Sequence, residues 1–222
     1  MRFLLLLIPL LFTALPASAQ LVVPLTTPDG RVGCTQGKTG IGRPPNWRAV
    51  ADPDGPDGWA LVESEPDATD QRFPLCIAEQ ASGRDFDATL RFKPVSGSRD
   101  QVAGFLFRAQ SANDYYVVRA NARDNSVRLY RMDKGKRSQL GSKEAPVALG
   151  QWHSLRVVAV NDRIEVALDG KPLFDVTDRA LVQAGPVGVW SQGDSVTHYG
   201  SLLIGPPPPA PAPAGPVPAA PR

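Results

Sequence analysis

Histidine and cysteine are scarce in this sequence. Its 222 residues include two of each, so a metal site built from several histidines or from a cysteine cluster is excluded by count. A site that combines one histidine with carboxylates stays open. The sequence also has no nucleophile-elbow, phosphate-loop or cysteine-based metal motif, which leaves most enzyme classes without support.

The sequence has no large excess of charge of either sign. It carries 24 Lys and Arg side chains against 22 Asp and Glu. If an N-terminal leader segment that contains Arg2 were removed, 23 basic and 22 acidic side chains would remain, a net charge of +1. Because nucleic-acid binding needs a concentrated basic face, we expect no nucleic-acid partner. Uncharged ligands such as saccharides fit this balance better.

Long apolar runs are missing except at the start of the chain. Met1-Arg2 supplies a positive charge, residues 3–15 are almost continuously apolar, and Ala17-Ser18-Ala19 resembles a signal-peptidase site. The run is shorter than the ~20 apolar residues of a membrane span. We expect residues 1–19 to be a signal peptide, a mature chain without an integral membrane segment, and export to the periplasm or the medium. A retained anchor is the alternative.

The two cysteines are Cys34 and Cys76, and export would place them where disulfides persist. A leftover pair in an exported chain favours a bridge. The bridge would close a 42-residue loop and stabilise the fold by roughly 4 kcal/mol. Two free thiols, with Cys76 buried in a strand, are the alternative.

Short runs with a period of two dominate residues 47–204. In residues 85–93, Phe86, Ala88, Leu90 and Phe92 alternate with polar side chains, as in a strand with one buried face. No window has a sustained apolar repeat of 3.6, so long helices are not expected. Strands are expected at 47–51, 59–63, 73–79, 85–93, 102–109, 115–121, 126–132, 152–160, 163–169, 171–175, 185–191 and 196–204. Many short strands at this spacing predict an all-β sandwich or barrel.

The flanking segments differ from this pattern. Residues 20–46 have little periodicity and are expected to form an irregular lead-in. Residues 205–222 contain nine prolines, which cannot continue a sheet. We expect an extended Pro/Ala-rich tail, either a spacer or a disordered terminus without a specific role.

Four segments resemble the concanavalin-A/laminin-G superfamily. Residues 151–157 (Gln-Trp-His-Ser-Leu-Arg-Val) and 163–170 (ending Val-Ala-Leu-Asp-Gly) resemble its W-H-x-L-R-V … V-x-L-D-G hairpin. Residues 184–190 (Ala-Gly-Pro-Val-Gly-Val-Trp) and 194–197 (Asp-Ser-Val-Thr) resemble its closing strands. The resemblance implies a jelly-roll of two stacked antiparallel sheets.

Two further segments narrow the resemblance. Residues 91–97 and 113–121 look like a bacterial exported group of 3-keto-disaccharide hydrolase, or family-16-glycoside-hydrolase-like, domains. The likeness covers residues 47–204 and implies a concave face able to hold a saccharide. It does not establish activity, because the E-x-D-x-E strand motif of family-16 glycosidases, whose retaining chemistry needs two carboxylates ~5 Å apart, is absent.

A 3-keto-sugar hydrolase would instead remove a proton next to a ketone. That reaction needs a base and a group that holds the developing enolate. The candidate bases are Glu79 and His198, for which a strand-end ion pair and a hydrogen-bonded structural histidine are the alternatives.

Alternation predicts one polar sheet face. If Phe105, Phe107, Val118, Ala120, Val127 and Leu129 point to the core, the opposite face carries Arg108, Arg119, Asn121, Arg128 and Tyr130. Guanidinium forks, an amide and a phenol suit sugar hydroxyls, although a solvated sheet face is the alternative. Trp190 is either a stacking platform or a core residue.

One acidic loop is a candidate calcium site. Asp52, Asp54 and Asp57 supply three carboxylates within a Gly-rich turn, and calcium prefers oxygen ligands. An ordinary acidic turn is the favoured alternative.

Three functional hypotheses follow. The first is an exported carbohydrate-binding domain of the 3-keto-disaccharide-hydrolase-like group, the second is an active 3-keto-glycoside hydrolase or lyase, and the third is an envelope scaffold module.

Overall fold

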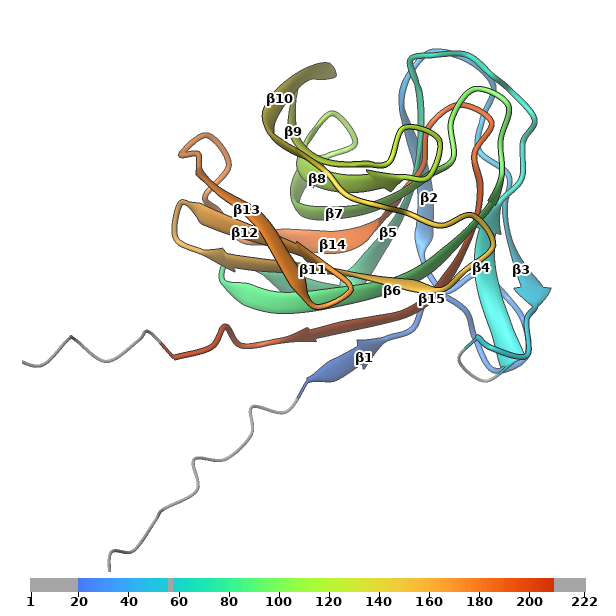
Figure 1. Cartoon of the computed structure of the whole chain (residues 1–222). Helices are drawn as coiled ribbons and strands as arrows, with labels where there is room; N and C mark the ends of the chain where they lie inside the picture. Colours follow the sequence, from blue (N-terminus) through green and yellow to red (C-terminus); the bar gives the residue numbers. More distant parts are fainter. Residues whose placement is uncertain (1–19, 56–57, 210–222) are drawn as a thin grey trace, which may run out of the picture.

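The structure, a computed structural model, describes residues 20–55 and 58–209 as two stacked antiparallel sheets (Figure 1). The predicted signal peptide and residues 210–222 of the predicted tail lie outside the described residues. The strands are β1 (Leu21–Val23), β2 (Thr35–Gly40), β3 (Trp47–Ala51), β4 (Trp59–Glu63), β5 (Arg72–Gly83), β6 (Phe86–Ser96), β7 (Val102–Ser111), β8 (Asp114–Asn121), β9 (Ser126–Asp133), β10 (Lys136–Glu144), β11 (His153–Val160), β12 (Arg163–Leu168), β13 (Lys171–Thr177), β14 (Gly185–Trp190) and β15 (Val196–Gly205).

The sheet orders confirm the predicted two-sheet sandwich. One sheet has eight strands in the order β13-β12-β11-β6-β15-β4-β3, with β1 also paired to β15. The other has seven, in the order β10-β9-β8-β7-β14-β5-β2. Neighbouring strands are antiparallel throughout both sheets. Within the described part of the chain, no helix is long and apolar enough to cross a membrane.

The main core lies between the sheets and follows the predicted alternation. Phe86, Leu90 and Phe92 of β6 are buried there, and the Phe86 ring packs edge-on against Phe105 and Phe107 of β7 from the facing sheet. Removing such apolar surface from water is the dominant stabilising contribution to the fold.

The seven-stranded sheet also carries buried apolar side chains on its outer face. Leu106, Val117, Met132 and Trp190 alternate with the residues of the main core and form a second apolar cluster that is fully buried. The sheet curls upward from β14 to β10 (Figure 1), so that β2 meets the turn between β7 and β8, where the Thr39 hydroxyl donates to the carbonyl of Ala112 at 2.5 Å. The outer face of this sheet is therefore the concave face of the sandwich.

Two expectations about the chain segments are corrected. The predicted irregular lead-in, residues 20–46, contains β1 and β2, and residues 136–144 form β10, which the apolar pattern did not predict. The predicted bridge is confirmed, because Cys34 and Cys76 are disulfide-bonded and join the segment before β2 to β5.

Candidate functional site

Four loops meet at one end of the concave face. They follow β4 (residues 64–71), β6 (97–101), β8 (122–125) and β14 (191–195). A pocket of about 560 Å³ opens between them. Its lining residues, which we call the Asp100 pocket, are Ala68, Asp70, Ser98, Arg99, Asp100, Arg123 and Gln192.

The Asp100 carboxylate is the most buried charged group of this pocket, with a residue exposure of 9%. Its Oδ1 accepts a hydrogen bond from Asn121 Nδ2 at 3.2 Å, and its Oδ2 accepts one from Gln192 Nε2 at 3.0 Å. Burial raises the pKa of Asp100, although the positive charge of Arg119 and the Asn121 hydrogen bond act in the opposite direction. Each oxygen keeps a lone pair for a ligand hydroxyl.

The loop that carries Asp100 is held in place by the carboxylate of Asp194, in the loop after β14. Asp194 Oδ1 accepts the backbone N–H of Arg99 at 3.0 Å, and its Oδ2 accepts the backbone N–H of Ser98 at 2.8 Å. Gly97 has a φ of +150°, and a Cβ there would lie 1.8 Å from the Asp100 carbonyl oxygen. Only glycine fits this turn, which places the carboxylate at the pocket wall.

Aromatic side chains form the floor beside the pocket. Trp190 stacks on Phe73 with ring centroids 5.2 Å apart, and its Nε1 donates to the Tyr115 hydroxyl at 3.1 Å. The Arg137 guanidinium covers this floor at 4.8 Å from the centroids of both Phe73 and Tyr130. The floor is thus closed from the solvent by a cation rather than by a hydrophobic side chain.

Arg137 is connected to the pocket through one amide. Its Nη1 donates to Gln192 Oε1 at 2.8 Å, while the Nε2 of the same amide donates to Asp100. Gln192 therefore holds the carboxylate and the guanidinium in fixed positions relative to each other.

Two more arginines lie farther along the concave face. Arg119 and Arg128 are cross-strand partners on β8 and β9, and Asp124 Oδ2 lies 3.6 Å from Arg119 Nη2 and 3.1 Å from Arg128 Nη2. The Arg119 side chain is only 5% exposed. Its Nε and Nη1 have no hydrogen-bond partner among the described residues, which is costly for a buried cation.

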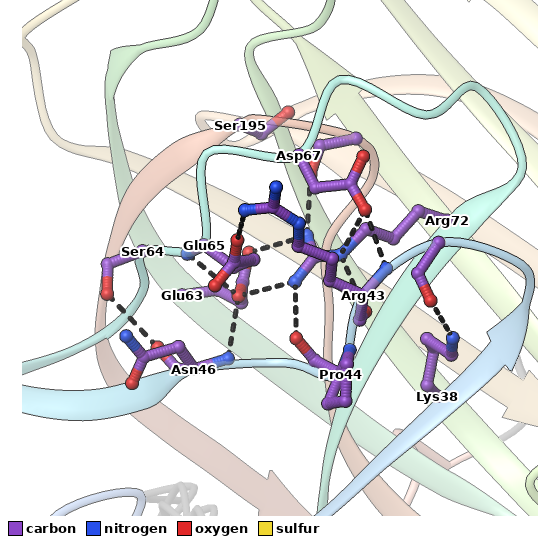
Figure 2. Close-up of polar contacts among 12 residues, drawn as sticks. Lys38, Arg43, Pro44, Asn46, Glu63, Ser64, Glu65, Asp67, Arg72 and Ser195 are labelled. Atoms are coloured by element: carbon purple, nitrogen blue, oxygen red, sulfur yellow. Dashed lines mark hydrogen bonds and ion pairs between the residues drawn. The ribbon is translucent and has the colours of Figure 1, made fainter.

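A buried ion pair supports the loops from below (Figure 2). The Arg72 and Glu63 side chains are 0% and 1% exposed, and two nitrogens of Arg72 bond both oxygens of Glu63 at 2.9 and 3.0 Å. The other Arg72 donors reach the backbone oxygens of Arg43, Pro44 and Gly193 at 3.1, 3.2 and 2.7 Å. A fully bonded pair of this kind offsets the desolvation of both charges.

This ion pair fixes the loop that carries Gln192. Besides donating to the Gly193 carbonyl, Arg72 accepts the Gly193 N–H on its own backbone oxygen at 3.0 Å. Glu63 Oε1 also accepts the backbone N–H groups of Asn46 and Glu65, as Figure 2 shows. The loop before β3, the loop after β4 and the loop after β14 are therefore held by one buried cluster.

Most predicted ligand-binding residues do share one face. Arg119, Asn121, Arg128 and Tyr130 all lie on the concave side, as alternation predicts. Trp190 lies on the same side but is fully buried, so it is a core residue under the site and not an exposed stacking platform.

The placement predicted for Arg108 is wrong. The pairing of β7 with β8 is irregular after Phe107, and Arg108 has a φ of +49°. Its guanidinium is buried and donates to the backbone oxygens of Arg84 and Asn161 at 2.8 Å. The bulge breaks the alternation and directs the side chain to the β11–β12 turn of the other sheet.

The two candidate bases do not form a site together. Glu79 is exposed on β5, while His198 lies on β15 in the other sheet. His198 Nδ1 lies 2.5 Å from Asp52 Oδ2, which also accepts from Lys93 Nζ at 2.8 Å. The histidine thus belongs to a structural cluster, which is the alternative that the sequence left open.

The acidic loop proposed for calcium is used differently. Asp57 lies outside the described residues, and the Asp52 carboxylate is paired with Lys93 and His198. Burial acts to raise the pKa of Asp52, but hydrogen bonds from these two side chains outweigh it and lower the pKa to about 2. The backbone N–H of Asp54 donates to Asp52 Oδ1 at 3.1 Å. Among the described residues, no group of three or more His, Cys, Asp or Glu side chains is arranged to hold a metal.

Three site residues were missed from sequence: Asp100, Arg137 and Gln192. Asp100 and Gln192 lie in loops whose positions depend on tertiary packing, and Arg137 lies on the polar strand β10. The one local signal was the polar run Ser191–Asp194 directly after the apolar end of β14.

The sequence model of the 3-keto-alpha-glucoside-1,2-lyase-like domain matches residues 40–199. Among curated proteins, a levanase of Bacillus subtilis (strain 168) is 24% identical over 117 residues. That alignment covers 51% of this chain but only 17% of the levanase.

Solved structures share the fold at low identity. The carbohydrate binding module CBM66 from Bacillus subtilis has a TM-score of 0.62 at 18% identity, covering 77% of this chain and 94% of that module. A Bacillus subtilis protein of unknown function with a galectin-like fold has a TM-score of 0.57 at 9% identity, with coverages of 77% and 89%. Domain 4 of AbnA, an extracellular arabinanase from Geobacillus stearothermophilus, in complex with arabinotriose, has a TM-score of 0.50 at 16% identity, with coverages of 78% and 82%.

Proposed function

This chain belongs to the 3-keto-alpha-glucoside-1,2-lyase-like domain family, and from that premise we propose that it binds a saccharide in the Asp100 pocket. The observation that carries the proposal is the buried Asp100 carboxylate, held by two amides at the wall of an open polar pocket. A fixed carboxylate accepts hydrogen bonds from adjacent sugar hydroxyls without reorganising.

The rest of the pocket suits the same ligand class. The lining balances Asp70 and Asp100 against Arg99 and Arg123, so it offers acceptors and donors in similar number. Sugar hydroxyls both donate and accept, and they need such a mixed lining. The pocket volume of 560 Å³ falls in the range of about 300–1,000 Å³ that is usual for small-molecule sites.

Two of the structural neighbours support a saccharide. CBM66 is named as a carbohydrate binding module, and the arabinanase domain was solved with arabinotriose. The leader-like residues 1–19 and the Cys34–Cys76 disulfide support a role in an exported, oxidising compartment.

A lyase activity is the second candidate, favoured by the surroundings of Asp100. A carboxylate whose pKa is raised by burial serves better as a base near neutral pH. On a 3-keto sugar it would take the proton of C2, while the C1–O bond breaks and the leaving oxygen is protonated. Arg119, whose charge acts on Asp100, would stabilise negative charge that develops on the ketone oxygen.

The first test is calorimetric titration of the full chain with neutral mono- and disaccharides and with 3-keto disaccharides. We expect Asp100→Asn to weaken binding at least tenfold, because one hydrogen bond to a charged group contributes about 1.5–3 kcal/mol. Asp175→Asn is the matched control, since Asp175 is exposed on β13 in the other sheet.

The outcomes separate the candidates. Binding that depends on Asp100 without product formation supports a binding domain, and an unsaturated keto product that disappears in Asp100→Asn supports the lyase. If Asp100→Asn binds every ligand as tightly as the unaltered chain, the Asp100 pocket is not the site.

A further inference from the structure

We infer that the saccharide bound by this domain is acidic, and that Arg137 and Lys136 receive its carboxylate in a second pocket beside the Asp100 pocket. The inference rests on the proposed function and adds a charge requirement to it. It comes from the position and the unpaired charge of Lys136 and Arg137, the first two residues of β10.

The second pocket adjoins the first. It has a volume of about 350 Å³ and shares Asp70 with the Asp100 pocket. Gln192, which lines the first pocket, bonds Arg137, which lines the second. We call this space the Arg137 pocket, and its lining residues are Asp70, Gln71, Phe73, Gly135, Lys136 and Arg137.

Among the described residues, the cations of the Arg137 pocket have no carboxylate partner. Its one acidic residue, Asp70, is paired with Arg99 at 3.3 Å. In residues 20–55 and 58–209, no carboxylate oxygen lies within 4.0 Å of a charged nitrogen of Arg137 or Lys136. The side-chain partner of Arg137 is the neutral amide of Gln192.

Arg137 is also held in a fixed orientation. Its guanidinium lies 4.8 Å from the ring centroids of both Phe73 and Tyr130, and Gln192 fixes one of its nitrogens. A guanidinium that is already ordered loses little entropy when it binds a carboxylate. Its planar fork matches the two oxygens of a carboxylate, which favours this group over a hydroxyl.

The charge of the surrounding concave face has the same sign. Arg119 and Arg128 share the single carboxylate of Asp124. The buried Nε and Nη1 of Arg119 have no partner in the described part of the chain. With Arg137, three arginine side chains of this face lie near two carboxylates, those of Asp100 and Asp124. This local excess attracts an anion.

The two pockets together define the class of ligand. The Asp100 pocket is balanced in charge and suits the hydroxyls of one sugar unit, and the adjoining Arg137 pocket suits a carboxylate. A uronic-acid unit linked to a second sugar supplies both groups over neighbouring positions.

The experiment compares matched ligands. Digalacturonate and glucuronosyl-glucose are titrated into the full chain beside their methyl esters and the corresponding neutral disaccharides. We expect at least one acid to bind about tenfold tighter than its ester at low salt, as one charge-assisted hydrogen bond would give. The advantage should shrink at ~0.5 M salt, since the pair is partly exposed to solvent.

Variants locate the effect. Lys136→Gln with Arg137→Gln should bring the acid-to-ester ratio close to one, while Asp100→Asn should weaken acid and ester alike. The matched control is Lys143→Gln with Lys171→Gln, two exposed lysines that line neither pocket; it should keep the ratio of the unaltered chain. Equal affinity for acid and ester, or a ratio that survives the double variant, would overturn the inference and leave saccharide binding intact. If no saccharide of any charge binds, the inference and the proposed function both fail.

Discussion

Replacement of Glu63 by glutamine tests whether the buried ion pair stabilises the fold. In Glu63→Gln the amide oxygen can still accept one of the N–H groups that Glu63 holds, and the side-chain volume hardly changes. The Arg72 guanidinium, however, keeps its charge in a site that is 0% exposed. Its nearest remaining carboxylate, Asp67, lies 3.9 Å away.

The expected cost can be worked from these contacts. Breaking a buried pair by removing one partner costs about 3–5 kcal/mol. Arg72 keeps its hydrogen bonds to the backbone oxygens of Arg43, Pro44 and Gly193, so we expect a value near the lower end, about 3 kcal/mol. For a domain of this size that corresponds to a fall in Tm of roughly 6–12 °C.

Urea unfolding followed by tryptophan fluorescence measures the change, with Tm from calorimetry as a second measurement. Glu165→Gln is the matched control, because Glu165 is half exposed on β12 and should change stability by less than about 0.5 kcal/mol. A loss below about 1 kcal/mol in Glu63→Gln, at an unchanged denaturant slope, would refute the argument that the charge of Glu63 is needed there.

Two further predictions concern the disulfide and the acid stability of the fold. Cys34→Ser with Cys76→Ser should lose roughly 4 kcal/mol of unfolding free energy, because the bridge spans 42 residues; the same urea measurement checks this, and a loss under ~1 kcal/mol contradicts it. The pKa of Asp52 is lowered to about 2 from an ordinary value of 3.8. The ionised Asp52 carboxylate therefore stabilises the fold at pH values above its unfolded-state pKa, and this contribution is lost as the pH falls from about 4 towards 2. Asp52→Asn should therefore be less stable at pH 7 and lose less stability over that acid range, and parallel pH–stability curves for the two proteins would disprove the role of Asp52.

The strands were predictable where one face is buried and the other is wet. In β6 and β12 the apolar side chains alternate with polar ones, and the two-residue period identifies them without tertiary information. Strand β10 could not be found this way, because all of its residues are exposed or half-buried. It is an edge strand held mainly by its pairing with β9.

The site was predictable only where it lies on regular strands. Alternation assigned Arg119, Asn121 and Arg128 to one face, and it failed at Arg108 because a bulge shifts the register by an amount the sequence does not reveal. Asp100 and Gln192 come together from loops 92 residues apart. Their contact depends on the pairing of β7 with β14 and on the Arg72–Glu63 pair, neither of which has a local pattern.

The pairing of β1 with β15 determines how the domain responds to tension between its ends. Leu21 lies opposite Ile204 in an antiparallel pair. A force that pulls residues 20 and 205 apart therefore acts on the hydrogen bonds between β1 and β15 one after another, and separates β1 from β15 starting at Leu21. Peeling meets a covalent stop at Cys34, which is bonded to Cys76 inside the seven-stranded sheet. The first strand can therefore yield as a short extensible segment, and the disulfide bond stops its peeling before β2 separates from β5.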